Sequence, residues 1–115
     1  MSEPARPVAV LVGPPGAGKT TIGRKLARRL DVPFRDADHL IEEAEGRSIP
    51  EIFASDGEPH FREIEERIIG DALTSFDGVL SLGGGAVLSA VTRRRLRGHR
   101  AVSYTHLTLP TNREV

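Results

Sequence analysis

A glycine-rich segment near the start of the chain has the residue types and spacing of a phosphate-binding loop. Residues 13–20 read Gly-Pro-Pro-Gly-Ala-Gly-Lys-Thr, the pattern G-x-x-x-x-G-K-[ST], and they follow the apolar run 8–12. Glycines let successive backbone N–H groups curl around a phosphate, and the N-terminus of the following helix favours an anion. Lys19 can reach the β- and γ-phosphate oxygens, and the Thr20 hydroxyl is placed to ligate Mg²⁺. The strand–loop–helix context favours nucleoside triphosphate binding over a chance glycine-rich turn.

Two carboxylates, Asp36 and Asp38, follow the second expected strand, residues 32–35. In open α/β sheets, ligands bind at the carboxyl ends of the strands. One carboxylate could therefore lie near Mg²⁺ and the other near the hydroxyl that accepts a phosphoryl group. The alternative is an Asx turn followed by a helix N-cap, for which aspartate is a favoured residue. Taken alone, the pair favours this capping interpretation.

An arginine and a triple glycine are further candidates for binding the acceptor. Arg62 lies within a long expected helix, and residues 83–85 follow the third expected strand. A guanidinium suits bidentate binding of a carboxylate, although an arginine on a helix more often belongs to a solvated ion pair. Three glycines expose backbone N–H groups and let a small ligand approach closely; the alternative is a loose turn.

The elements that must position these residues alternate between strands and helices. Strands are expected at residues 8–12, 32–35 and 79–82, and helices at 21–30, 38–45, 49–56, 58–74 and 89–97. The third of these helices begins with a capping box formed by Ser48 and Glu51. In the first helix, a stripe of Ile22, Leu26 and Leu30 is expected to face the sheet. In the long helix, the spacing predicts the i,i+4 ion pairs Arg62–Glu66 and Glu63–Arg67. The order predicts a three-layer αβα domain with a mostly parallel sheet.

Composition excludes several classes of function. The chain has 115 residues, enough for one domain, and its 16 Lys+Arg balance its 16 Asp+Glu, so no net charge attracts nucleic acid or a membrane surface. There is no cysteine and no signal-peptide pattern, and a cytoplasmic location is expected. The four histidines lack metal-ligand spacing, and the arginines of residues 93–97 are read as a solvated helix face.

In order and spacing, these segments resemble shikimate kinase over residues 8–102. The resemblance is carried by the phosphate-binding loop, Asp36-x-Asp38, Gly46-Arg-Ser-Ile-x-Glu-Ile-Phe53, Gly57-Glu-x-x-Phe61-Arg62-x-x-Glu65 and Gly83-Gly-Gly85-Ala. It implies a P-loop kinase fold and transfer of the γ-phosphoryl group of ATP to the 3-hydroxyl of shikimate, a step of aromatic amino-acid biosynthesis, by a monomer that uses Mg²⁺.

The resemblance also implies a role for each matched residue. Lys19 would neutralise charge on the phosphates, and Asp38 would bind the acceptor hydroxyl as base or orienting group. Thr20 and Asp36 would hold Mg²⁺, with Ser81 acting through water. ATP would lie on Gly16, Ala17, Gly18, Lys19, Thr20 and Thr21. Shikimate would contact Asp38, Arg62, Gly83, Gly84 and Gly85, inside walls formed by Phe53 and Phe61, and Glu65 would brace Arg62.

The end of the chain departs from the family pattern. Family members continue with a strand, a helix and a lid that carries an arginine, then a second arginine for the shikimate carboxylate. Residues 103–115 do not resemble this continuation. They are expected to form a disordered or artefactual tail on a partial kinase domain, residues 1–102, that is incomplete on its C-terminal side. Little turnover is therefore expected of the chain as written. Two other interpretations stay open: a kinase of another small hydroxy acid such as gluconate, and a catalytically silent nucleotide-binding fragment.

Overall fold

The computed structural model describes residues 7–13 and 18–99 and, as backbone, residues 102–104. Gly16 and Ala17, which the sequence places in the nucleotide site, lie outside the described residues, as does the tail after residue 104. The expected boundary after residue 102 falls inside a strand, and the division of the chain there stays a prediction.

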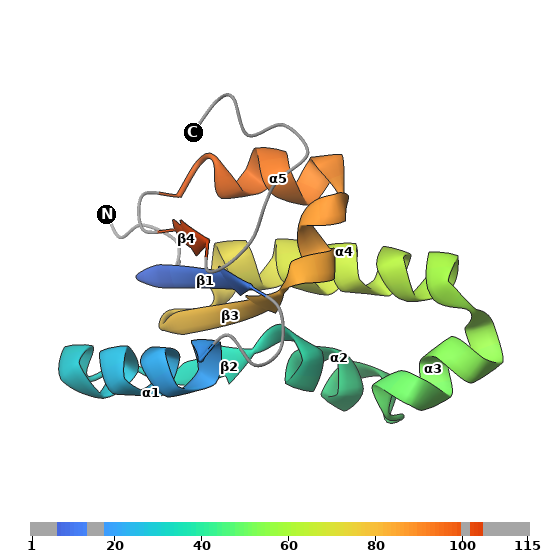
Figure 1. Ribbon diagram of the computed structural model, residues 1–115, viewed down its shortest axis with the longest axis horizontal. Coiled ribbons are helices and arrows are strands. Elements are labelled where there is room, and N and C mark those ends of the chain that lie inside the picture. Colours follow the sequence, from blue (N-terminus) through green and yellow to red (C-terminus); the bar gives the residue numbers. More distant parts are fainter. Residues whose placement is uncertain (1–6, 14–17, 100–101, 105–115) are drawn as a thin grey trace.

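A parallel sheet forms the centre of the molecule (Figure 1). Its strands are β1 (Ala9–Gly13), β2 (Phe34–Asp36), β3 (Val79–Gly83) and β4 (Val102–Tyr104), in the order β2-β3-β1-β4. All three pairings are parallel. β1 is buried along its whole length and β3 along all but its last residue, as their continuous apolar sequences predict for strands covered on both faces. The sequence analysis identified β1, β2 and β3, and β4 extends the sheet beyond them.

Helices cover both faces of this sheet, which confirms the three-layer prediction. They are α1 (Lys19–Leu30), α2 (Ala37–Glu45), α3 (Ile49–Asp56), α4 (Glu58–Ser75), the 3₁₀ turn η1 (Gly84–Leu88) and α5 (Ala90–Leu96). α1 lies against one face, and α4 and α5 lie against the other, while α2 and α3 project beyond the end of the sheet (Figure 1). Within the described ranges, no helix combines the length and the apolar composition that crossing a membrane requires.

The face that α1 turns to the sheet differs from the predicted one. The buried residues are Lys19, Gly23 and Ala27, whereas Ile22 and Leu30 are 51% and 48% exposed. The reason is close packing. A Cβ at Gly23 would collide with the ring of Phe34, so the helix axis lies nearer to the sheet than a row of leucines would allow. The prediction was therefore wrong for Ile22 and Leu30, whereas Leu26 is partly buried and packs against the same core as Ala27.

Other local expectations had mixed outcomes. The Ser48–Glu51 capping box is present, and the long helix ends one residue later than expected. The second strand is shifted to Phe34–Asp36, and η1 occupies most of the segment that was expected to be an open loop. The predicted i,i+4 pairs were wrong. The Arg62 side chain bonds to Glu65 and Glu58, and its predicted partner Glu66 bonds to Ser89 instead.

Candidate active site

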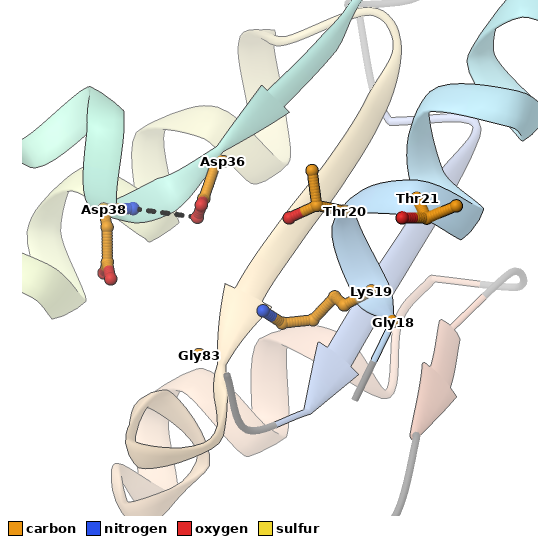
Figure 2. Close-up of a pocket in the computed structure, with 7 residues that line it drawn as sticks. All are labelled: Gly18, Lys19, Thr20, Thr21, Asp36, Asp38 and Gly83. Carbon is orange, nitrogen blue, oxygen red and sulfur yellow. Dashed lines mark hydrogen bonds between the residues drawn. The ribbon is translucent and has the colours of Figure 1, made fainter. Parts of the chain in front are cut away.

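A cavity of about 370 Å³ opens where the carboxyl ends of β2 and β3 meet the N-termini of α1 and α2 (Figure 2). Its lining consists of Gly18, Lys19, Thr20, Thr21, Asp36, Asp38 and Gly83. The Thr20 hydroxyl points across it toward Asp36, whose carboxylate is turned to the Asp38 backbone N–H, and the Lys19 side chain extends into the same space. Segments far apart in the sequence thus bring one ammonium, two hydroxyls and two carboxylates together.

The first turn of α1 is built to receive an anion. Gly18 has φ +81°, a left-handed conformation that glycine adopts without strain, and no side chain caps the helix there. Among the described residues, no side chain therefore accepts a hydrogen bond from the first N–H groups of α1. Lys19 is only 8% exposed, and within the described ranges no carboxylate is close enough to form an ion pair with it. A buried cation without an ion-pair partner, at an uncapped helix N-terminus, favours binding of a phosphate.

The two aspartates have different surroundings. Asp36 is the N-cap of α2, because its Oδ1 accepts a hydrogen bond from the Asp38 backbone N–H at 3.2 Å. The capping interpretation is thus correct for Asp36, and its carboxylate still lines the cavity. Removal from bulk water raises the pKa of Asp38, and the charge of Asp36 raises it further, while Lys19 opposes both effects. A carboxylate with a raised pKa that faces a cavity is suited to hold or accept a proton.

Ser81 on β3 supports a cation site beside Asp36. The two residues are paired in register, and they share the sheet face of Val79 and Phe34, which α1 covers. The Ser81 hydroxyl is fully buried and has no hydrogen-bond partner in the described part of the chain. Magnesium prefers oxygen ligands and keeps several waters. The Thr20 hydroxyl, the Asp36 carboxylate and the orphaned Ser81 hydroxyl fit this preference. Among the described residues, no group of three or more acidic, histidine or cysteine side chains is placed so that it could hold a metal ion by itself.

Arg62 is held rigidly at the edge of this site. Its Nη1 donates to Glu65 Oε1 at 2.8 Å and its Nε to Glu58 Oε2 at 3.4 Å, and the guanidinium lies 5.3 Å from the centre of the Phe61 ring. Burial raises the pKa of Glu65, while its bond to Arg62 lowers it. Nη2 has no protein acceptor among the described residues, so one edge of the fork remains available to a ligand.

Gly85 provides the space in which the guanidinium lies. A Cβ at this position would come within 2.6 Å of Arg62 Nη1 and 2.8 Å of Nη2. None of residues 83–85 has a positive φ. These glycines were expected to make room for a ligand, but at Gly85 the absence of a Cβ makes room for the guanidinium of Arg62.

The structure thus brings the described nucleotide-side candidates together in one cavity, which the acceptor-side candidates Asp38 and Gly83 also line. Arg62, Gly84 and Gly85 do not line the 370 Å³ cavity, although the charge of Arg62 acts on Asp38. The Phe53 and Phe61 rings contact each other with centroids 4.7 Å apart.

The contact between Ser89 and Glu66 was not predicted from the sequence, which paired Glu66 with Arg62 instead. The only sequence signal for their contact was that Ser89 begins a helix.

Comparison with known proteins identifies the family. The family model described as shikimate kinase matches residues 15–113. The shikimate kinase of Rhodococcus erythropolis is 59% identical over 97 residues, which cover 84% of this chain and 57% of that protein. The shikimate kinase of Mycobacterium avium is 59% identical over 96 residues, which cover 84% and 54%.

Solved structures of shikimate kinases have the same fold as this chain. A shikimate kinase from Acinetobacter baumannii in complex with shikimate superposes with a TM-score of 0.77 at 40% identity, over 93% of this chain and 58% of that one. The shikimate kinase of Aquifex aeolicus gives a TM-score of 0.79 at 31% identity, over 90% and 60%. The chain therefore spans between half and two thirds of the length of these relatives. Because the family model matches most of the chain and the fold agrees, this protein belongs to the shikimate kinase family.

Proposed function

We propose that this chain carries the nucleotide site and part of the acceptor site of an ATP-dependent kinase that phosphorylates the 3-hydroxyl of shikimate. The observation that carries the proposal is the placement of Lys19 and Thr20 across one cavity from Asp36 and Asp38, with the Arg62 fork beside it. The relatives named above are shikimate kinases, and one of them is solved in complex with shikimate.

Each group has a defined task in this proposal. The N-terminus of α1 and the Lys19 ammonium bind the phosphates of ATP and offset the charge that grows on them during transfer. Thr20, Asp36 and, through water, Ser81 would hold Mg²⁺, which would supply positive charge that offsets the charge of the phosphates. The free edge of Arg62 binds the carboxylate of shikimate.

Asp38 would receive a hydrogen bond from the acceptor hydroxyl and orient it toward the γ-phosphorus. The raised pKa of Asp38 suits it to take the proton that the hydroxyl loses as the new P–O bond forms. Catalysis in such a site comes mainly from positioning and from fixed charges.

The test is ADP release with ATP and shikimate, with ATP and gluconate, and with ATP alone. It is run on the 115-residue chain and on a hybrid in which residues 1–99 are followed by the remaining part of the Rhodococcus erythropolis relative. The proposal predicts shikimate-dependent turnover by the hybrid and no response to gluconate. A hybrid that is folded and binds ATP, yet ignores shikimate, would contradict it.

A further inference from the structure

We infer that Glu66 and Ser89 act as a pair of positioning residues that set the distance between Arg62 and the glycine turn η1. This inference rests on the proposed function, since it concerns how the chain builds its site for the acceptor carboxylate. It begins from two contacts that join α4 to the segment 84–89.

The two contacts, Arg62 with Gly85 and Glu66 with Ser89, lie four residues apart both on α4 and on the segment 84–89. At one end, the Arg62 guanidinium lies against Gly85. Four residues later on α4, Glu66 Oε2 accepts a hydrogen bond from the Ser89 hydroxyl, and Ser89 also lies four residues after Gly85. Residues four apart on a helix share a face, so Arg62 and Glu66 present neighbouring groups to the same turn. The second contact therefore fixes how η1 lies along α4, and thereby where Gly85 lies under the guanidinium.

Ser89 is well suited to transmit this constraint. Its Oγ donates to Glu66 and also accepts from the Thr92 backbone N–H at 3.1 Å, which caps α5. Arg93, on α5, donates from Nη1 to the Val87 carbonyl at 2.6 Å and joins α5 to η1. Arg95 reaches back to the Glu66 carbonyl at 3.3 Å. The turn is thus tied to α5, and both are tied to α4 at Glu66.

Neither side chain lines the 370 Å³ cavity. Glu66 and Ser89 consequently act through Arg62 and the turn. Loss of their contact frees η1 to move relative to α4, and any such movement changes the fit between Gly85 and the guanidinium. That fit is tight, because the guanidinium occupies the space that a Cβ at position 85 would need. The binding of an acidic acceptor should respond to that change, whereas the binding of nucleotide at α1 should not.

The experiment compares Glu66→Gln, Ser89→Ala and Ser89→Thr with the matched control Glu63→Gln. Glu63 lies on the same helix, its side chain is 80% exposed, and it makes no contact with η1. Calorimetry on the 115-residue chain measures the Kd for shikimate in the presence of MgADP and, separately, the Kd for MgADP. A second readout, the ¹⁵Nε resonance of Arg62, needs no ligand.

The inference predicts that Ser89→Ala, which removes the contact, raises the Kd for shikimate about 10-fold, because a small misplacement of a binding group has effects of this size. Glu66→Gln keeps an oxygen that can accept from Ser89 but loses the negative charge, so it should raise the Kd less, and the double variant should be no weaker than Ser89→Ala alone. Ser89→Thr, which keeps the hydroxyl, should restore affinity, and Glu63→Gln should match the wild type. In all variants the Kd for MgADP should stay unchanged.

Unchanged shikimate affinity in Ser89→Ala, or an equal loss in Glu63→Gln, would overturn the inference. So would an Arg62 ¹⁵Nε resonance that moves no more in Ser89→Ala than in the control. If the wild-type chain binds no shikimate, the variants are compared in the hybrid chain instead, and a folded hybrid that binds ATP but not shikimate shows that the proposed function fails. The ligand-free resonance then decides by itself whether Glu66 and Ser89 position Arg62.

Discussion

Replacing Gly85 with alanine tests whether the absence of a side chain at this position is needed to place the Arg62 guanidinium. The structure puts the new Cβ 2.6 Å from Nη1, 2.8 Å from Nη2 and 3.0 Å from Cζ of Arg62, whereas ordinary contact begins near 3.4 Å. The guanidinium must therefore retreat by about 0.8 Å, the difference between 3.4 and 2.6 Å. A shift of this size can stretch the 2.8 Å bond to Glu65 beyond the range of a good hydrogen bond.

We expect Gly85→Ala to weaken shikimate binding by about 10- to 100-fold, since a misplacement near 1 Å costs up to about that much. The fold should be little affected. Gly85 does not have a positive φ, so alanine can adopt its backbone conformation, and the displaced atoms are the end of a flexible side chain. MgADP affinity should be unchanged, because Gly85 is not part of the nucleotide cavity.

Calorimetry with shikimate and with MgADP, together with a thermal melt, checks these three statements. Gly98→Ala is the matched control, because a Cβ there meets only the Arg95 carbonyl at 3.4 Å, outside the site. Shikimate affinity in Gly85→Ala equal to that of the control would refute the assignment of Gly85 to Arg62. Parallel losses of shikimate affinity, MgADP affinity and melting temperature would show that the substitution disturbs the fold instead.

Three further predictions concern other residues. Lys19→Ala should weaken MgADP binding by at least about 10-fold, because a charge-assisted bond to phosphate is lost; equal calorimetric affinities would contradict this. Asp38 binds its proton more tightly in the folded chain, so stability falls as pH rises from its ordinary pKa of 3.8 to the raised value. Asp38→Asn should therefore raise the melting temperature more at pH 7 than at pH 3, and an equal gain at both would be inconsistent. Thr92→Val should stabilise the chain by about 1 kcal/mol in urea unfolding, because the buried Thr92 hydroxyl has no partner in the described part of the chain; a loss of stability would show that it has one.

Much of the fold could be predicted because its signals are local. The apolar runs of β1 and β3, the Ser48–Glu51 capping box and the glycines that end α2 and α3 each lie within a few residues of sequence. The cavity followed from topology, because the carboxyl ends of parallel strands meet at one edge. Lys19, Thr20, Asp36 and Asp38 were brought together there as expected.

The parts that were missed depend on packing between distant segments. Ile22 and Leu30 have the spacing of a buried stripe, yet Gly23 is buried in their place because α1 packs closely against Phe34 and Leu11. The partner of Glu66 lies 23 residues away, at Ser89, whereas helix spacing offers only nearby partners such as Arg62. Periodicity cannot tell how closely two elements approach, and that approach decides which residues are buried and which are paired.

The central claim is that nucleotide and shikimate bind to two separate sets of residues in this chain. A pair of NMR titrations of the ¹⁵N-labelled 115-residue chain tests it most directly. MgADP should shift the backbone amides of residues 18–21, and shikimate added afterwards should shift those of Gly84 and Gly85 and the Nε–H of Arg62. Shikimate that shifts none of these groups, or that displaces MgADP from residues 18–21, would contradict the account.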